Sequence, residues 1–281
     1  MSKNFVQNAS MRRMLLSGYR LWARAQIWRS GPRIFVNSIP KAGTHLVTAE
    51  LDKFASLQNS RLHLQAHEIG SFAGRDLEDA SLDLDKVRRQ IATVRRGQFF
   101  SAHLPWSAPL AEMLRGSDVR SIFVTRDPRD ILVSRLHYIK GLKRHPLHAF
   151  VAGLPSDQER LRVLVEGRSG SPFIRPMAEA LSGFLAWTTD PAVLTVRFED
   201  LVGERGGGTR EAKAAALAGI CRHCELPADR LEAFAASAPK ATPTLRAGKA
   251  NAWRGAIPPE VAALIHARCG PQIAAMGYPE S

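Results

Sequence analysis

A turn whose residue types could bind a phosphate follows the apolar run at residues 33–39 and reads PKAGTHL. Gly43 lets backbone N–H groups approach an anion, Thr44 adds a hydroxyl donor, and the helix expected next directs its positive end at the same point. Lys41 adds a charge that can reach an oxygen of a bound phosphate group. The lysine precedes the glycine by two residues, whereas the usual phosphate loop places it directly after one. Taken alone, this turn could also be the start of an ordinary helix.

A second candidate anion site lies in the segment FVTRDPRDILVSRLHYI, residues 123–139. A strand ends at Arg126, an Asp-Pro turn follows, and Ser134 falls one or two turns into the next helix. A guanidinium fork with a hydroxyl suits a terminal phosphate better than a lysine does. The alternative is that Arg126 pairs with Asp127 or Asp130 as a structural clamp.

Both motifs follow expected strands. Four short, nearly continuous apolar runs predict buried strands of a parallel sheet, and helical patterns separate them. The sequence therefore predicts a single α/β domain with a central parallel sheet flanked by helices, in a doubly wound arrangement. The expected strands are residues 33–39, 97–104, 120–126 and 192–198, and the expected helices are 43–57, 107–115, 130–140, 157–166, 176–188, 210–224 and 228–237.

Positive charge is concentrated near the N-terminus. The formal net charge is +13, and residues 1–49 contain eight Lys or Arg and no Asp or Glu. This balance suits a polyanionic ligand, whether a nucleotide, a nucleic acid or an anionic membrane surface. Residues 1–32 are expected to form a basic amphipathic helical segment, in which residues 11–30 either lie on a membrane or pack on the domain with solvated arginines. A cleaved transit peptide is a lesser alternative.

Other features of the sequence indicate a soluble intracellular protein. No apolar stretch approaches the roughly 20 residues of a membrane span, and three cysteines are too few for a disulfide framework. Cys221 and Cys224 in CRHC lack a second ligand pair, so a structural role is expected there. Residues 203–210 are interpreted as a flexible surface loop and residues 140–176 as an insertion over the site.

The chain carries five motifs in a characteristic order and spacing: PKAGTHL, SAHLP, FVTRDPRDILVSRLHYI, VRFEDLVG and LRAGKANAWRG. Together they resemble the nucleotide-dependent sulfotransferases of the cytosolic type, over roughly residues 33–256, and PKAGTHL is closer to bacterial members. The resemblance implies a P-loop-like sulfotransferase fold over residues 33–281. It also implies 3′-phosphoadenosine 5′-phosphosulfate (PAPS) as donor, adenosine 3′,5′-bisphosphate (PAP) as product and no metal.

For the donor site, the resemblance implies that the turn after the first strand holds the 5′-phosphosulfate. The residues of that turn are Lys41, Ala42, Gly43, Thr44, His45 and Leu46. Arg126 and Ser134 would hold the 3′-phosphate. A C-terminal element of that family closes over the same phosphate, and it corresponds here to Arg246, Ala247 and Gly248, with Lys249 as an additional candidate.

The resemblance also implies a base. A histidine at the end of a strand takes the proton from the acceptor in that family, and this is His103 in SAHLP. Imidazole suits the task because its pKa lies near neutrality. In the implied in-line displacement, His103 deprotonates an acceptor hydroxyl and Lys41 stabilises charge on the leaving phosphate. An amine acceptor would depend less on His103.

Two positions depart from that family. Leu46 stands where the cytosolic animal enzymes place a tryptophan on the adenine, and Phe198 stands where they commonly carry a tyrosine. Packing on the adenine must therefore differ in detail, and one hydroxyl contact near the cofactor is absent.

The expected function is a PAPS-dependent sulfotransferase that acts on a small-molecule or lipid-like acceptor, in the cytoplasm and with peripheral membrane contact left open. A nucleotide-dependent phosphotransferase is one alternative, but the displaced lysine and the missing carboxylate for magnesium oppose it. A protein that binds a polyanion or a membrane surface is the other. Nucleic acid is not expected as a partner, because Trp22 and Trp28 lie at helical spacing. The identity of the acceptor and the oligomeric state stay open.

Overall fold

The computed structural model describes residues 17–18, 31–71, 81–169, 174–237 and 248–278. The expected N-terminal helical segment therefore falls almost entirely outside the described residues. The core is a five-stranded sheet with the strand order β2-β5-β1-β6-β7, in which every neighbouring pair is parallel. Its strands are β1 (Arg33–Ser38), β2 (Gln58–Gln65), β5 (Gln98–His103), β6 (Val119–Thr125) and β7 (Val193–Arg197).

The four apolar runs of the sequence are confirmed as β1, β5, β6 and β7. β2 was not predicted; it forms one edge of the sheet and reads QNSRLHLQ. Its residues alternate between buried and more exposed positions, so only every second side chain enters the core. This strand was hidden because its polar residues break the continuous apolar pattern that marks the central strands.

Most expected helices are confirmed within a few residues. The first is shorter than expected and ends at Leu51, because residues 52–57 form two turns that lead to β2. The sequence analysis missed α4, α7 and α13. The main helices are α2 (Thr44–Leu51), α4 (Leu84–Ile91), α5 (Ala108–Gly116), α6 (Pro128–Gly141), α7 (His148–Gly153), α8 (Asp157–Glu166), α9 (Met177–Leu185), α11 (Arg210–Cys224), α12 (Leu231–Ala236) and α13 (Pro259–Ala275). Short elements are α3 (Ala66–Ile69), α10 (Phe198–Leu201), β3 (Gly70–Ser71), β4 (Ser81–Leu82) and 3₁₀ turns at Ala186–Thr188, Glu204–Gly206 and Ala252–Gly255.

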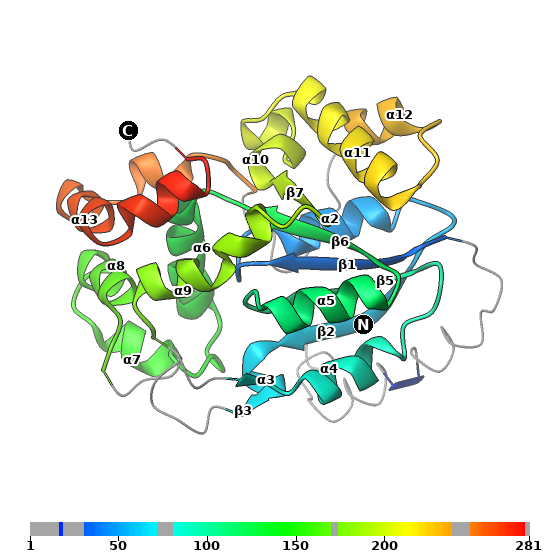
Figure 1. Cartoon of the computed structure of the whole chain (residues 1–281). Helices are drawn as coiled ribbons and strands as arrows, with labels where there is room; N and C mark the ends of the chain where they lie inside the picture. The colour runs from blue at the N-terminus through cyan, green and yellow to red at the C-terminus, as the bar shows by residue number, and fades with distance from the viewer. Residues whose placement is uncertain (1–16, 19–30, 72–80, 170–173, 238–247, 279–281) are drawn as a thin grey trace.

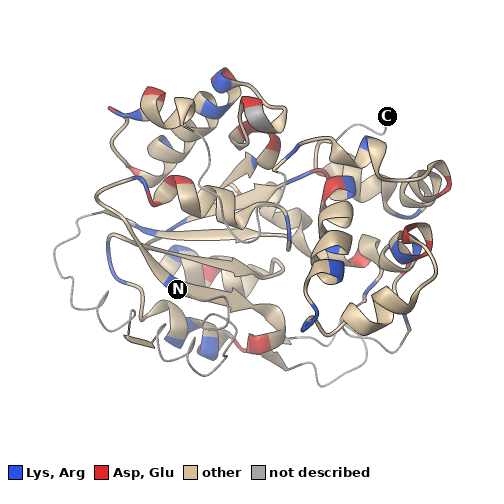
Figure 2. Cartoon of the chain, turned by 180° about the vertical axis from the view of Figure 1, so that it is seen from behind, with Lys and Arg blue, Asp and Glu red and all other residues tan. Residues whose placement is uncertain are grey.

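Helices cover both faces of the sheet, and each face buries its own apolar cluster. Helices α2 and α11 pack on one face and α5 on the other (Figure 1). Helices α6 to α9 and α13 lie beyond the carboxyl ends of the strands (Figure 1). Among the described residues, basic and acidic positions intermingle over these helices (Figure 2). The arrangement places the ends of β1, β5 and β6 together, where an open α/β sheet binds its ligand.

Candidate active site

The turn between β1 and α2 is tight. The Ala42 N–H donates to the Ile39 carbonyl at 3.0 Å. Lys41 and Gly43 both have positive φ, 77° and 116°. Because these conformations reverse the chain within a few residues, the N-terminus of α2 lies against the carboxyl end of the sheet.

The first turn of α2 has no cap. Gly43 occupies the N-cap position and has no side chain to accept a hydrogen bond, and the first bonds of the helix run from Leu46 and Val47 to the Gly43 carbonyl. The described residues offer no acceptor to the N–H groups of Gly43, Thr44 and His45. Three donors and the positive end of the helix are therefore free to bind an anion.

The side chains of this turn point in different directions. Ala42 and Leu46 are buried, and Leu46 packs in the apolar cluster with Ile34 and Val36. The side chain of Leu46 therefore faces the core, in agreement with the expectation that packing on the adenine differs at this position. Thr44 is also buried, and its hydroxyl bonds that of Ser38. His45 lies at the surface.

Replacing Gly43 with alanine is expected to lower the free energy of unfolding by about 2 kcal/mol. A Cβ at this position would lie 2.6 Å from Cδ2 of Phe198, a buried ring, and the positive φ strains any L side chain. Urea unfolding measures the change. The double variant Gly43→Ala/Phe198→Leu should recover the part of the lost free energy that comes from the clash with the Phe198 ring. An unchanged stability of Gly43→Ala would contradict this explanation of the turn.

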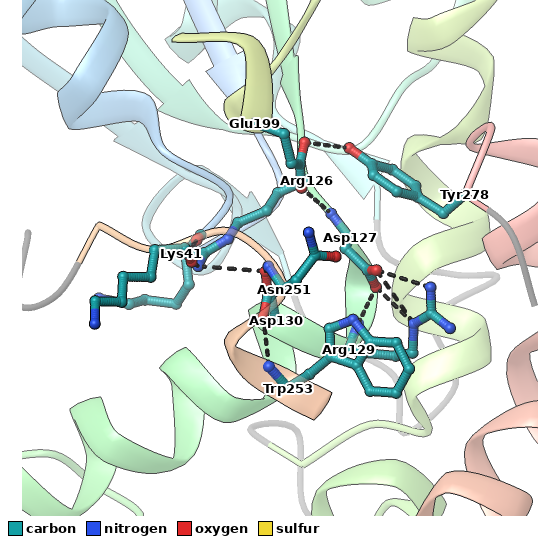
Figure 3. Close-up of polar contacts among 10 residues, drawn as sticks. Lys41, Arg126, Asp127, Arg129, Asp130, Glu199, Asn251, Trp253 and Tyr278 are labelled. Carbon is teal, nitrogen blue, oxygen red and sulfur yellow. Dashed lines mark hydrogen bonds and ion pairs between the residues drawn. The ribbon is translucent and has the colours of Figure 1, made fainter. Parts of the chain in front are cut away.

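Arg126 is held beside the turn between β1 and α2 by backbone carbonyls (Figure 3). Its Nη1 donates to the Lys41 carbonyl at 3.4 Å and its Nη2 to the Lys249 carbonyl at 2.9 Å. The guanidinium also stacks 4.1 Å from the centre of the Phe198 ring, and Asp130 lies 3.8 Å away. Its Nε is buried and has no hydrogen-bond partner in the described part of the chain. Burial lowers the pKa of Arg126, an effect that the Asp130 carboxylate opposes.

Asp130 joins the C-terminal segment to the site. Its carboxylate accepts the N–H of Asn251 at 2.8 Å and that of Trp253 at 2.9 Å (Figure 3). Gly248 and Lys249 therefore lie beside Arg126, whereas Arg246 and Ala247 lie outside the described residues. The alternative interpretation, a structural clamp, is confirmed for Asp130, because Nη2 of Arg126 forms an ion pair with its carboxylate at 3.8 Å. The same carboxylate also holds the segment after Gly248 through the N–H groups of Asn251 and Trp253.

The glycine-rich loop at residues 203–210 supports the same segment. The Gly206 carbonyl accepts the Ala250 N–H at 2.8 Å, and a Cβ on Gly206 would lie 2.2 Å from the Gly248 carbonyl oxygen. The loop was interpreted as a surface loop only, because close approach of two backbones leaves no pattern in the sequence other than glycine itself.

Glu199 braces the turn after β6, and sequence reasoning missed it. One carboxylate oxygen accepts the Asp127 N–H at 2.9 Å, and the other accepts the Tyr278 hydroxyl at 2.9 Å (Figure 3). Burial raises the pKa of Glu199. Arg129 forms an ion pair with Asp127 at 2.8 Å. The charged sequence RDPRD indicates local ion pairs. Tyr278 lies too far along the chain for a local sequence pattern to predict its contact with Glu199.

Ser134 lies in the second turn of α6, half-buried. Its hydroxyl makes no hydrogen bond to another described residue. One turn further, the exposed Tyr138 reaches Lys41, whose Nζ lies 4.1 Å from the centre of its ring. Burial and the nearby Arg126 lower the pKa of Lys41. The ring of His145, from the insertion expected over the site, contacts Tyr138 edge-on.

His103 ends β5 beside the turn. Its Nδ1 donates to the Ser38 carbonyl at 2.9 Å and lies 3.3 Å from the Ser38 hydroxyl, which in turn bonds Thr44. No described residue bonds Nε2, which is left as the acceptor nitrogen of the neutral ring. Burial, followed by the neighbouring His63, lowers the pKa of His103 to about 3. The expected base is therefore neutral and joined by hydrogen bonds to the donor turn.

The free energy of unfolding is expected to fall as the pH drops below about 6.5, the pKa of an unperturbed histidine. Burial lowers the pKa of His63 to about 4 and that of His103 to about 3, so the unfolded chain binds more protons between pH 6.5 and these values. Each histidine changes the free energy of unfolding by at most about 1.4 kcal/mol per pH unit. Urea unfolding at pH 7.5, 6.0 and 5.0 measures the loss of unfolding free energy. His63→Phe should remove the part of the pH dependence that comes from His63. A stability independent of pH over this range would contradict the prediction.

Comparison with known proteins decides the family. A model of the sulfotransferase domain matches residues 31–277, nearly the whole chain. The chain belongs to the sulfotransferase family. No curated protein matches the sequence. The two other functions that the sequence left open, phosphotransfer and binding of a polyanion or membrane surface, find no support in these comparisons.

Solved structures share the fold of this sulfotransferase. The crystal structure of mouse sulfotransferase SULT7A1 complexed with PAP is 14% identical, covers 88% of this chain and 89% of that chain, and has a TM-score of 0.54. Retinol dehydratase in a complex with retinol and PAP is 17% identical, covers 91% of this chain and 86% of that chain, and has a TM-score of 0.51. At such identities the likeness shows the fold.

The remaining expectations concern features away from the site. The Cys221 thiol donates to the Pro227 carbonyl and His223 bonds the Ser121 carbonyl, as a structural role for CRHC requires. Among the described residues, no group of three His, Cys, Asp or Glu side chains could hold a metal ion. No helix in the described part of this sulfotransferase combines the length and apolar character needed to cross a membrane.

Proposed function

We propose that this sulfotransferase takes its sulfuryl group from PAPS and transfers it to a hydroxyl group of a small molecule. The observation that carries the proposal is the position of Arg126. Two backbone carbonyls hold its guanidinium at the phosphate-binding turn, and its Nε–H is buried without a partner. An arginine fork in this position suits a phosphate on the 3′ oxygen of the ribose, which PAPS and PAP carry and ATP lacks.

The described residues fit a nucleotide with phosphate groups at both ends. The uncapped N–H groups of Gly43, Thr44 and His45 form one anion site. Arg126 and Ser134, on the strand and helix next to it, would form the other, and Gly248 and Lys249 would close over the second site. Because Asp130 fixes the backbone that follows Lys249, this closing segment is already in place.

In the proposed reaction, the donor supplies the sulfuryl group and the chain supplies a base, a cation and oriented N–H groups. Nε2 of His103 accepts the proton of the acceptor hydroxyl, because Nδ1 is occupied by the Ser38 carbonyl. Lys41 and the N–H groups of the turn stabilise the negative charge on the leaving phosphate. Lys41 would have to leave the Tyr138 ring to reach that charge.

The proposed acceptor is a hydroxyl compound of small size. The structurally similar retinol dehydratase binds retinol, which is an alcohol, and the position of His103 suits an acceptor whose proton must be removed. Membrane contact through residues 11–30 is compatible with an apolar alcohol. An amine would attack without this base.

Calorimetric titration with PAP, AMP and ATP in the absence of magnesium tests the donor. We expect PAP to bind at least about 100-fold more tightly than AMP, because the 3′-phosphate adds charge-assisted hydrogen bonds. Labelled PAPS incubated with a panel of phenols, sterols, long-chain alcohols, sugars and amines then tests the acceptor. Equal binding of PAP and AMP, or tighter binding of ATP, would overturn the donor assignment.

A further inference from the structure

A second histidine lies beside the base on the edge strand that the sequence analysis missed. β2 and β5 pair in parallel with His63 opposite Ser101 and Gln65 opposite His103. Because side chains alternate along a strand, His63, Ser101 and His103 share one face of the sheet. The His63 and His103 rings meet edge to face, with centroids 4.8 Å apart and planes at 84°.

Both rings are fixed by hydrogen bonds. Nδ1 of His63 lies 2.9 Å from the Ser101 hydroxyl, and Nδ1 of His103 lies 2.9 Å from the Ser38 carbonyl. A histidine pair of this kind is not needed to hold the edge strand, because Leu62 and Leu64 already anchor β2 in the core. The contact instead covers one side of the imidazole that the proposed reaction uses as its base.

The groups that surround the pair are basic or neutral. Lys41 from the turn and His45 from α2 act on His103, and His45 and His67, from α2 and α3, act on His63. Each of these influences opposes protonation of the two rings. Among the described residues, the Ser38 carbonyl is the contact that favours a charged His103. The protonation state of His103 therefore depends on how well its ring is shielded from water.

We propose that His63 is a positioning residue for the base. Its ring, anchored by Ser101, packs against the His103 imidazole, holds it in the plane that Ser38 selects, and keeps water from it, so that Nε2 is left free for the acceptor. The role of His103 rests on the proposed function, but the effect of His63 on that ring does not. No proton passes between the two histidines in this proposal.

NMR titration of the histidine rings in the full chain tests the inference, with His103→Asn used to assign the signals. In the wild type we expect His103 to stay neutral, as a single Nδ1–H tautomer, from pH 8 to pH 5.5. In His63→Ala, loss of the covering ring should admit water and move the midpoint of His103 to between about 5.5 and 6.5. In His63→Phe, an apolar ring restores the cover and should restore a neutral His103. Ser101→Ala should act in the same direction as His63→Ala but less strongly.

His67→Ala is the matched control, because it removes an exposed histidine on α3 and should leave the titration of His103 unchanged. If His103 titrates alike in the wild type, His63→Ala and His63→Phe, with all three folded, the inference is wrong. PAP binding measured on the same samples separates this result from failure of the proposed function. Normal PAP binding with an unmoved His103 would overturn the role of His63 alone, whereas loss of PAP binding in the wild type would overturn the donor assignment.

The pH profile of kcat/KM gives a second readout with any acceptor from the panel. The acid limb should move to higher pH in His63→Ala and stay in place in His63→Phe. A merely structural role would lower the activity of both variants without moving the limb.

Discussion

Arg126→Ala is expected to weaken PAP binding by about 100-fold, which corresponds to about 2.7 kcal/mol. Arg126 is pinned between the Lys41 and Lys249 carbonyls, so it meets the ligand without ordering a flexible side chain. Its Nε–H has no partner among the described residues, and we expect the bound 3′-phosphate to supply one. The same substitution removes the contact that joins the phosphate-binding turn to the C-terminal segment. Calorimetry with PAP and with AMP measures both effects.

Two variants make this prediction specific. Arg126→Lys keeps the charge but loses the fork, so its PAP binding should lie between those of the wild type and the alanine variant. Arg129→Ala removes the neighbouring buried arginine, which pairs with Asp127 and stacks on Trp253. It should lower the melting temperature while PAP still binds much more tightly than AMP. If Arg126→Ala is folded and still prefers PAP to AMP as strongly as the wild type, Arg126 does not hold the 3′-phosphate.

His103→Asn is expected to lower kcat by about 1,000-fold with a hydroxyl acceptor, within the range that general base catalysis contributes. Asparagine keeps an N–H that can donate to the Ser38 carbonyl, so the end of β5 should be preserved. PAP binding should change by less than about threefold, because in the proposed reaction His103 contacts the acceptor and not the nucleotide. The rate of PAP formation from PAPS, followed by chromatography, measures the effect.

An amine acceptor distinguishes a base from a merely structural histidine. An unprotonated amine attacks before it loses its proton, so its transfer should fall much less in His103→Asn than transfer to an alcohol does. His67→Asn is the control, since it makes the same change at an exposed histidine on the neighbouring α3. Equal losses for both acceptors, or a full rate with the alcohol, would show that His103 is not the base.

Much of the donor site could be predicted from local sequence. The turn at Lys41 to Thr44 and the strand-turn-helix at Arg126 are short segments in which each residue type reflects a local geometric need. Leu46 shows the limit of this reasoning. Its place in a motif suggested contact with the nucleotide, but a residue early in a helix faces either the ligand or the core, and only packing decides which.

Residues that support the site from a distance could not be predicted. Asp130 holds Asn251 and Trp253 across more than 120 positions of the chain, and Glu199 joins Asp127 to Tyr278. Such pairs have no fixed spacing, because each depends on how three or four elements stack. His63 escaped notice for the same reason, since it lies on a polar edge strand whose pattern does not predict a buried strand.

Local rules predict an α/β fold and two candidate anion sites after the first and third apolar strands, from the apolar runs of parallel strands, the glycine in a tight turn and the arginine at the end of a strand. The sulfotransferase family is indicated by the order of five motifs and shown by the family model. Only the tertiary structure decided which atoms of those residues are free. Hydrogen bonds to Ser38, Lys41 and Lys249 leave Nε2 of His103 and Nε of Arg126 without partners among the described residues, and such bonds form only where separate strands and loops meet.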